Sequence, residues 1–244
     1  MMKQFGLIGY PLTHSFSPNY FNQKFDNEDI NAEYMAYPLE TITDYCALVE
    51  QINFVGLNVT IPYKESIISF LDEIDEVAHA IGAVNTITFE DGVSKGYNTD
   101  AGGFRESLLS FIGDLSCIKS ALILGNGGAA KAVKYVLKCL GIKFKIVSRS
   151  GNGDLTYDDL GASEISSSNL IINTTPLGMY PNVAYSPKLP YNLLDEKYFL
   201  FDLVYNPEKT IFLTEGLNRG CKIKNGHEML ILQAEYAWHI WNHH

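Results

Sequence analysis

A glycine-rich turn near the middle of the chain has the residue spacing of a dinucleotide-binding site. The turn lies between an apolar run and a segment with helical character, and its residues, Gly125-Asn126-Gly127-Gly128-Ala129-Ala130, fit the pattern G-x-G-x-x-A. Gly125 permits a tight turn, Gly127 lets backbone approach a pyrophosphate, and the small Ala130 lets a helix pack on the preceding strand. The free N–H groups at the start of that helix would bind phosphate. An ordinary strand-to-helix turn is the alternative, but the flanking elements favour a nucleotide site.

A second group of polar residues, Asn58, Thr60 and Lys64, runs from the end of an expected strand into the start of an expected helix. Alternation along the strand puts Asn58 and Thr60 on one face. Lys64 would open the next helix, where its charge opposes the helix dipole. Most lysines are simply solvated, but a lysine in this unfavourable place could stabilise a developing alkoxide and transfer a proton.

Further polar residues fit the same edge of the first sheet. Asn85 enters a strand, and Asp100 precedes or caps a helix. A carboxylate beside Lys64 would hold the ammonium group and could accept a substrate hydroxyl. Ser15 and Ser17 supply two hydroxyls at the start of another helix, which favours an anion there, and Ser17 could also act as the helix N-cap.

The elements that must position these residues alternate between strand and helix along the whole chain. Strands are expected at Phe5 to Gly9, Glu33 to Pro38, Gly56 to Ile61, Val84 to Phe89, Ala121 to Leu124, Phe144 to Val147, Leu170 to Asn173 and Phe199 to Val204. Helices are expected at Pro18 to Phe25, Ile42 to Gln51, Lys64 to Leu71, Gly102 to Phe111, Ala129 to Leu140 and His227 to Trp241. This order predicts two α/β units, the second a doubly wound sheet, with a last helix that could pack on either unit.

The composition is that of an acidic enzyme with no nucleic-acid or membrane partner. The 244 residues carry a net charge of −10, and 46% of them are hydrophobic, enough to bury one large core or two smaller ones. No apolar stretch reaches bilayer length, and Met1 to Phe5 leads directly into a strand, so a cytoplasmic location is expected. The cysteines stand far apart, which predicts reduced and mostly packed thiols, and no metal site is indicated because the only helical His pair, His239 and His243, ends the chain.

Seven motifs occur in one order along the chain: H-S-x-S-P at 14–18, N-V-T-x-P-x-K at 58–64, G-A-V-N-T at 82–86, N-T-D at 98–100, G-x-G-G-A-A at 125–130, D-L-V-Y-N-P at 202–207 and G-x-x-M-L-x-x-Q-A at 226–234. In this order and spacing they resemble the shikimate dehydrogenase family, over essentially the whole chain. The resemblance implies a substrate domain over residues 1–100 plus 225–244, completed by the C-terminal helix. It also implies an inserted Rossmann-like NADP-binding domain over residues 101–224.

The activity implied by the resemblance is the interconversion of 3-dehydroshikimate and shikimate with NADP(H), in the pathway to chorismate and aromatic amino acids. The expected assembly is a monomer or homodimer. By position, the carboxylate of the substrate would be bound by Ser15, Ser17 and Tyr205. Its ring hydroxyls would be bound by Lys64, Asn85, Asp100 and Gln233, with Asn58 and Thr60 nearby. Lys64 and Asp100 would be catalytic. The cofactor would be held by residues 125–130 together with Ser148, Arg149, Ser150, Thr174, Leu203 and Gly226.

The chain departs from the family pattern at several positions. Asn126 replaces the usual Ala of the phosphate turn, and Phe21 replaces a second His and is expected to serve packing. Ser148-Arg149-Ser150 stands for N-R-T, and Gly151-Asn152-Gly153 follows where a second basic residue is often found. An NAD-dependent enzyme that also oxidises quinate remains an alternative, although it usually carries an acid where Arg149 stands. A catalytically silent nucleotide-binding protein is another, although it would not need both Lys64 and Asp100.

Overall fold

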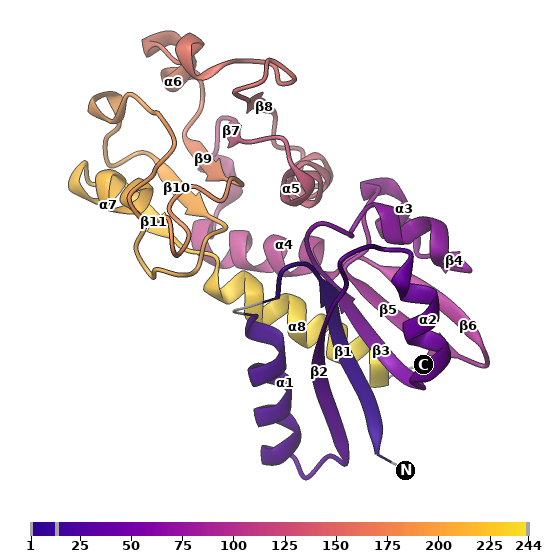
Figure 1. Ribbon diagram of the computed structural model, residues 1–244. Helices are drawn as coiled ribbons and strands as arrows, with labels where there is room; N and C mark the ends of the chain where they lie inside the picture. The colour runs from indigo at the N-terminus through magenta and orange to yellow at the C-terminus, as the bar shows by residue number, and fades with distance from the viewer. Residues whose placement is uncertain (1, 13–14, 243–244) are drawn as a thin grey trace. The chain divides into compact units, whose positions relative to one another are not determined.

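The computed structural model describes residues 2–12 and 15–242 and divides into two compact units (Figure 1). Unit 1 comprises Met1–Thr99 and Ala234–His244, and unit 2 comprises Asp100–Gln233. The last helix, α8 (His227–Asn242), is therefore shared between them. His14 of the N-terminal motif and His243 lie outside the described residues.

Unit 1 is built on a mixed six-stranded sheet in the order β2-β1-β3-β5-β6-β4. Its elements are β1 (Lys3–Gly9), α1 (Phe16–Asn27), β2 (Ala32–Pro38), α2 (Asp44–Gln51), β3 (Phe54–Val59), a 3-10 helix (Ser66–Phe70), β4 (Glu73–Ile74), α3 (Glu76–Ile81), β5 (Thr86–Glu90) and β6 (Val93–Tyr97). Strand β1 pairs in parallel with both β2 and β3, so the carboxyl ends of these three strands lie at one edge of the sheet. Strands β5 and β6 form an antiparallel hairpin beside β3.

The two faces of this sheet carry separate hydrophobic cores. Phe5 and Leu7 of β1 belong to an aromatic cluster with side chains of α1 and α8, whereas Ile8 faces the second cluster, as alternation along a strand requires. Phe21 is fully buried in the first cluster, which confirms its predicted packing role. Trp241 of α8 enters the same cluster, and its indole Nε1 donates to the carbonyl oxygen of Ile87 at 3.0 Å. The end of α8 is thereby fixed in unit 1.

Unit 2 is built on a parallel five-stranded sheet in the order β11-β10-β9-β7-β8. Its elements are α4 (Thr99–Ile112), which begins at the last residue of unit 1, a 3-10 helix (Leu115–Cys117), β7 (Ala121–Leu124), α5 (Gly128–Cys139), β8 (Phe144–Val147), a 3-10 helix (Tyr157–Asp159), α6 (Ala162–Ser167), β9 (Leu170–Asn173), a 3-10 helix (Tyr191–Leu193), β10 (Phe199–Asp202), α7 (Ile211–Asn218) and β11 (Lys222–Lys224). From β7 the chain goes first to β8 on one side and then to β9 on the other. Ligands of such sheets bind outside the carboxyl ends of the strands, at this reversal.

Several sequence expectations were wrong in detail. The helix expected from Lys64 to Leu71 is a turn followed by a 3-10 helix of five residues, so Lys64 does not open an α-helix and the dipole argument for it fails. The N-cap of α1 is Ser15, not Ser17, and Asp100 lies inside the first turn of α4 rather than capping it. Cys46, Cys117 and Cys139 are exposed, and of the four cysteines only Cys221 is buried. In the described part of the chain, no helix combines the length and the apolar composition that a membrane crossing needs.

Candidate functional site

Unit 1 places Asn58 and Asn85 together at the carboxyl edge of its sheet. Asn58, at 5% exposure, donates through Nδ2 to the carbonyl oxygen of Asn85 at 3.2 Å and to Thr86 Oγ1 at 3.1 Å. Its Oδ1 accepts the hydroxyl of Tyr34 at 2.7 Å. Both ends of the Asn58 amide are thus engaged by protein groups, which fixes β2, β3 and β5 to one another.

Asn85 connects this edge to the start of α4. Its Oδ1 accepts the backbone N–H of Thr99 at 2.7 Å, and its Nδ2 donates to Thr99 Oγ1 at 2.9 Å. Both residues are buried. Asp100 is the next residue of the helix, so the position of its backbone is set by this pair of hydrogen bonds.

The turn that carries Thr60 and Lys64 is held by backbone hydrogen bonds. The N–H of Thr60 donates to the carbonyl oxygen of Ile8 at 2.9 Å, and the carbonyl oxygen of Lys64 accepts the N–H of Val84 at 2.7 Å. Gly9 is required here, because an added Cβ would lie 2.4 Å from Thr60 Cγ2. The half-buried side chain of Lys64 therefore starts from a backbone that is tied to β1 on one side and to the segment before Asn85 on the other.

The predicted anion site lies at the N-terminus of α1. Ser15 is the N-cap but makes no side-chain capping hydrogen bond, and the first turn contains no acidic residue. Ser17 hydrogen-bonds to Tyr34, whose pKa is raised well above its usual value by complete burial, an effect that the Ser17 hydrogen bond opposes. Because Tyr34 also donates to Asn58, a continuous chain of hydrogen bonds joins Ser17 to the buried edge of the sheet.

The glycine turn of unit 2 combines a glycine of positive φ with an open helix N-terminus. Gly125 has φ +102°, and an added Cβ would lie 2.8 Å from Thr175 Cγ2 and 3.0 Å from Thr174 Oγ1. Gly127 is the N-cap of α5, with no capping side chain, and a Cβ added there or at Gly128 would meet nothing within 4 Å. The backbone N–H groups of this helix N-terminus are thus open to an approaching phosphate. Thr174 completes the turn, since its hydroxyl donates to the carbonyl oxygen of Leu124 at 2.8 Å.

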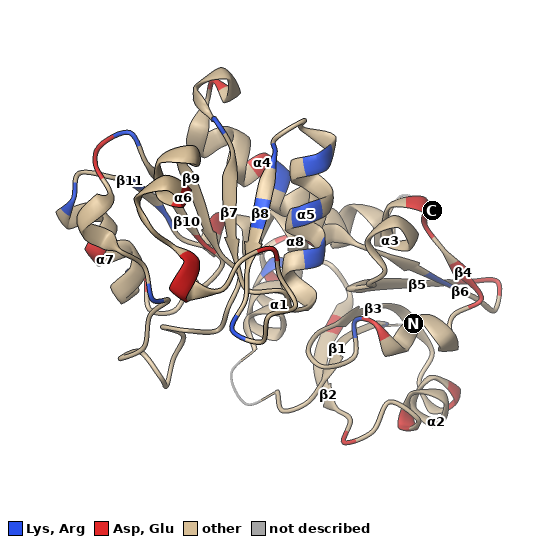
Figure 2. Ribbon diagram, turned by 90° about the horizontal axis from the view of Figure 1, so that it is seen from above, with Lys and Arg blue, Asp and Glu red and all other residues tan. Residues whose placement is uncertain are grey.

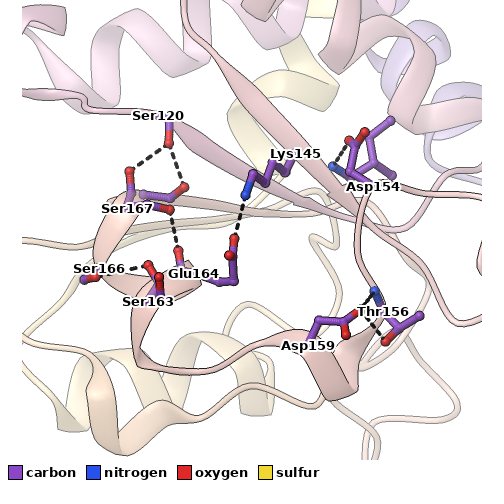
Figure 3. A network of polar contacts seen from close by, with 11 residues as sticks. Ser120, Lys145, Asp154, Thr156, Asp159, Ser163, Glu164, Ser166 and Ser167 are labelled. Carbon is purple, nitrogen blue, oxygen red and sulfur yellow. Dashed lines mark hydrogen bonds and ion pairs between the residues drawn. The ribbon is translucent and has the colours of Figure 1, made fainter.

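The loop after β8 carries Ser148, the exposed Arg149 and Ser150. Both serine hydroxyls donate to Asn152 Oδ1, from Ser150 at 2.8 Å. The base of the loop is closed where the Asp154 carboxylate accepts the backbone N–H of Ile146 at 2.8 Å (Figure 3). Beyond it, Thr156 and Asp159 form a capping box, and Lys145 pairs with Glu164 of α6 at 2.7 Å. Hydrogen bonds therefore connect the loop from within and at its base.

The remaining cofactor candidates, Leu203 after β10 and Gly226 after β11, lie side by side. An added Cβ at Gly226 would lie 2.1 Å from the carbonyl oxygen of Leu203, so only glycine fits this approach. Tyr205 and Gln233 also belong to unit 2. Gln233 donates through Nε2 to the carbonyl oxygen of Leu230 at 2.8 Å, and burial raises the pKa of Tyr205. Their proposed substrate contacts stay predictions.

A buried network that sequence reasoning missed holds the carboxyl ends of β9 and β10. Asp202, with no exposed surface, accepts from Asn173 Nδ2 at 2.9 Å, from the backbone N–H of Val204 at 3.0 Å and from Thr210 Oγ1 at 2.6 Å. Desolvation raises the pKa of its carboxyl to about 6 despite these three donors. The signal was present in the sequence, because Asn173 and Asp202 each end an apolar run. Tyr34, whose backbone pairs with the side chain of Asn22 in both directions at 2.9 Å, gave no such signal.

Comparison with known proteins gives a consistent result over the whole chain. A family model described as the shikimate dehydrogenase substrate binding domain matches residues 7–87. The shikimate dehydrogenase (NADP(+)) of Methanococcus maripaludis is 39% identical, over 98% of this chain and 91% of that protein. A crystal structure of a shikimate dehydrogenase in complex with NADP+ has a TM-score of 0.85 at 36% identity, covering 99% of this chain and 90% of the other. The Thermus thermophilus shikimate 5-dehydrogenase, solved in complex with NADP(H) and shikimate, has a TM-score of 0.86 at 32% identity, covering 99% and 94%.

Proposed function

The chain belongs to the shikimate dehydrogenase family, and we propose that it catalyses the reversible reduction of 3-dehydroshikimate to shikimate with NADP(H). This reaction belongs to the shikimate pathway, which leads to chorismate and the aromatic amino acids. The observation that supports these roles for the chain's own residues is the Asn85–Thr99 pair, which ties the start of the helix bearing Asp100 to the sheet edge of Asn58 and Thr60.

Lys64 and Asp100 are the proposed catalytic residues. A bound nicotinamide would supply or accept the hydride at C3 of the substrate ring. In the reducing direction the Lys64 ammonium stabilises the negative charge that develops on the C3 oxygen and supplies or relays the proton to it. The Asp100 carboxylate orients the ammonium and accepts a hydrogen bond from a neighbouring ring hydroxyl.

Ser15 and Ser17 are proposed to bind the substrate carboxylate, with Tyr205. The N-terminus of α1 suits an anion because Ser15 leaves its hydroxyl uncommitted to capping and no acidic residue occupies the first turn. Asn85 and Gln233 would bind ring hydroxyls of the substrate, and Thr60 would lie near these hydroxyls. Asn58, whose amide is already engaged, would act mainly by positioning Asn85.

The residues of unit 2 fit NADP. The open N-terminus of α5 would hold the pyrophosphate, with Thr174, Leu203 and Gly226 around it. Arg149 would bind the 2′-phosphate through the planar array of N–H donors of its guanidinium group. An enzyme that selects NAD commonly carries an acid in place of such an arginine, because the acid binds the ribose 2′-hydroxyl and repels the 2′-phosphate.

A spectrophotometric assay tests the proposal directly. We expect reduction of NADP with shikimate, a higher kcat/KM for NADP than for NAD, and little turnover of quinate. Preferred oxidation of quinate with NAD would favour the quinate enzyme, and nucleotide binding without turnover of either substrate would favour a silent binding protein. A cytoplasmic location and a monomeric or homodimeric assembly stay predictions from the sequence.

A further inference from the structure

We propose that Lys134 of α5, positioned by Asn126, is a specificity-determining residue for the adenosine 2′-phosphate of NADP. The inference rests on the proposed NADP-dependent function and deepens it. Lys134 would supply a second positive charge beside that of Arg149, because Gly151-Asn152-Gly153, which follows Arg149, contains no cation.

A chain of hydrogen bonds links Lys134 to the loop after β8. The Lys134 ammonium donates to Asn126 Oδ1 at 3.0 Å, and Asn126 Nδ2 donates to the carbonyl oxygen of Asn152 at 2.7 Å. Asn152 Oδ1 in turn accepts the hydroxyls of Ser148 and Ser150. One side-chain amide therefore separates the Lys134 charge from the loop that carries Arg149, and that amide belongs to the phosphate turn itself.

The serine hydroxyls alone are poor phosphate ligands in this arrangement. Each hydroxyl has one proton, and Ser148 and Ser150 both direct theirs at Asn152. A 2′-phosphate beside them depends on charged donors instead. Arg149 is one such donor, and its side chain is exposed, so solvent screens it. Lys134 is half-buried and its ammonium is held in place, so its charge is screened less.

The charge of α5 is unusual for this chain. Overall there are 28 Asp and Glu against 18 Lys and Arg, yet α5 contains three lysines and no acidic residue. Figure 2 shows the basic residues on successive turns of this helix. An anionic ligand at the N-terminus of α5 would be attracted both by the backbone N–H groups there and by this local excess of positive charge.

The role of Lys134 can be tested by measuring ligand binding to the protein, without turnover. Isothermal titration with 2′,5′-ADP and with 5′-AMP gives the ratio of their affinities, which isolates the contribution of the 2′-phosphate. The wild-type protein should prefer 2′,5′-ADP. The Lys134→Gln variant, which keeps a donor for Asn126 but no charge, should lower the ratio about 3- to 10-fold while 5′-AMP affinity holds. Lys134→Arg should keep most of the preference.

Matched variants separate this role from a general charge effect or a structural one. Lys138→Gln removes an exposed lysine from the last turn of the same helix and should leave the ratio unchanged. Arg149→Ala should lower the ratio at least as much as Lys134→Gln. Asn126→Ala should also lower it, and combining Asn126→Ala with Lys134→Gln should add little, because the two act through one contact.

The outcomes separate the proposed use of NADP from the proposed role of Lys134. A wild-type protein without preference for 2′,5′-ADP contradicts NADP as the cofactor. A wild-type preference that persists in Lys134→Gln, or falls equally in Lys138→Gln, overturns the role of Lys134 and leaves the proposed function standing. Additive effects of the Asn126 and Lys134 changes would overturn the positioning role of Asn126.

Discussion

Asn85 and Thr99 exchange two hydrogen bonds, one from the Thr99 backbone N–H to Asn85 Oδ1 at 2.7 Å and one from Asn85 Nδ2 to Thr99 Oγ1 at 2.9 Å. Both side chains are buried, so neither partner can exchange these bonds for water at low cost. The pair therefore couples the stability of the sheet edge to Thr99, the residue directly before Asp100.

Replacing Asn85 with Ala should lower both stability and activity. The loss of a buried amide leaves the backbone N–H of Thr99 unsatisfied, whereas its hydroxyl keeps the Thr86 hydroxyl as a partner at 3.3 Å. The expected cost is about 1–3 kcal/mol in the free energy of unfolding. Urea unfolding and kcat/KM for shikimate measure the two effects. Ser94→Ala, which removes a part-buried hydrogen bond to Asp72 elsewhere in unit 1, is the control and should lower stability alone. An Asn85→Ala variant with unchanged stability would reduce Asn85 to a simple substrate ligand.

Replacing Lys64 with Ala should affect turnover more than binding. If the ammonium stabilises charge that appears in the transition state, kcat should fall by about 10²–10⁴ while KM for shikimate changes much less. Asp100→Asn should lower kcat in the same way as Lys64→Ala. It should raise the KM for shikimate more, because a ring hydroxyl loses its acceptor. Steady-state kinetics with saturating NADP measure both. A near-normal kcat in Lys64→Ala is the result expected of a solvated lysine, and it would end the catalytic assignment.

Replacing Ser15 with Ala should raise KM for shikimate with little change in stability, because this hydroxyl makes no capping bond in α1. Each hydrogen bond lost to a carboxylate is worth about 1.5–3 kcal/mol, and the Ser15→Ala, Ser17→Ala double variant should lose more. The affinity for 2′,5′-ADP is the control and should not move. Equal losses of cofactor and shikimate affinity would indicate a folding defect instead.

The parts of this fold that the sequence predicts well are those fixed by local pattern. The buried strands of unit 2 and the turn at Gly125 were found because apolar runs and glycine spacing report directly on backbone and burial. The second strand of the β5–β6 hairpin was missed although a signal was present. Asp91 and Gly92 both have positive φ, at 48° and 81°, and Asp-Gly between two short segments that contain β-branched and aromatic residues indicates a tight hairpin.

Other features depend on partners distant in sequence. The carbonyl of Lys64, which an α-helix would pair with the N–H of Ile68, accepts Val84 instead, and Ile68 donates to Glu65 three residues back. No local pattern reports that choice. Likewise the residue types of Asn58 and Asn85 suggest substrate contact, but only the folded chain reveals that Tyr34, Thr86 and Thr99 already engage them.

Asp202 should make stability depend on pH. Its pKa is raised from the ordinary 3.8 to about 6 by desolvation, so the native state favours the neutral carboxyl. That contribution to stability is complete below about pH 4 and is lost as the pH rises through 6, by about 3 kcal/mol. Relative to Asp202→Asn, the free energy of unfolding of the wild type should therefore fall across this window. Urea unfolding from pH 4 to 8 measures the difference. Asp158→Asn, at an exposed position, should run parallel to the wild type, and parallel curves for Asp202→Asn would contradict the prediction.

Gly56 should tolerate no side chain, because it faces the indole of Trp241. An added Cβ would lie 2.1 Å from Trp241 Nε1, so Gly56→Ala must displace the ring and the hydrogen bond to Ile87. We expect a loss of about 1–3 kcal/mol in the free energy of unfolding, whereas Gly161→Ala, where a Cβ meets nothing within 4 Å, should cost far less. Gln233 and Trp241 lie in the same helix, α8. If the displaced ring shifts this helix, the KM for shikimate should also rise.

A second substitution tests whether Gly56 and Trp241 compete for space. Adding Trp241→Phe, which removes the clashing nitrogen, should cost less in the Gly56→Ala background than in the wild type. Strictly additive costs in urea unfolding would show that the two residues do not compete for the same space.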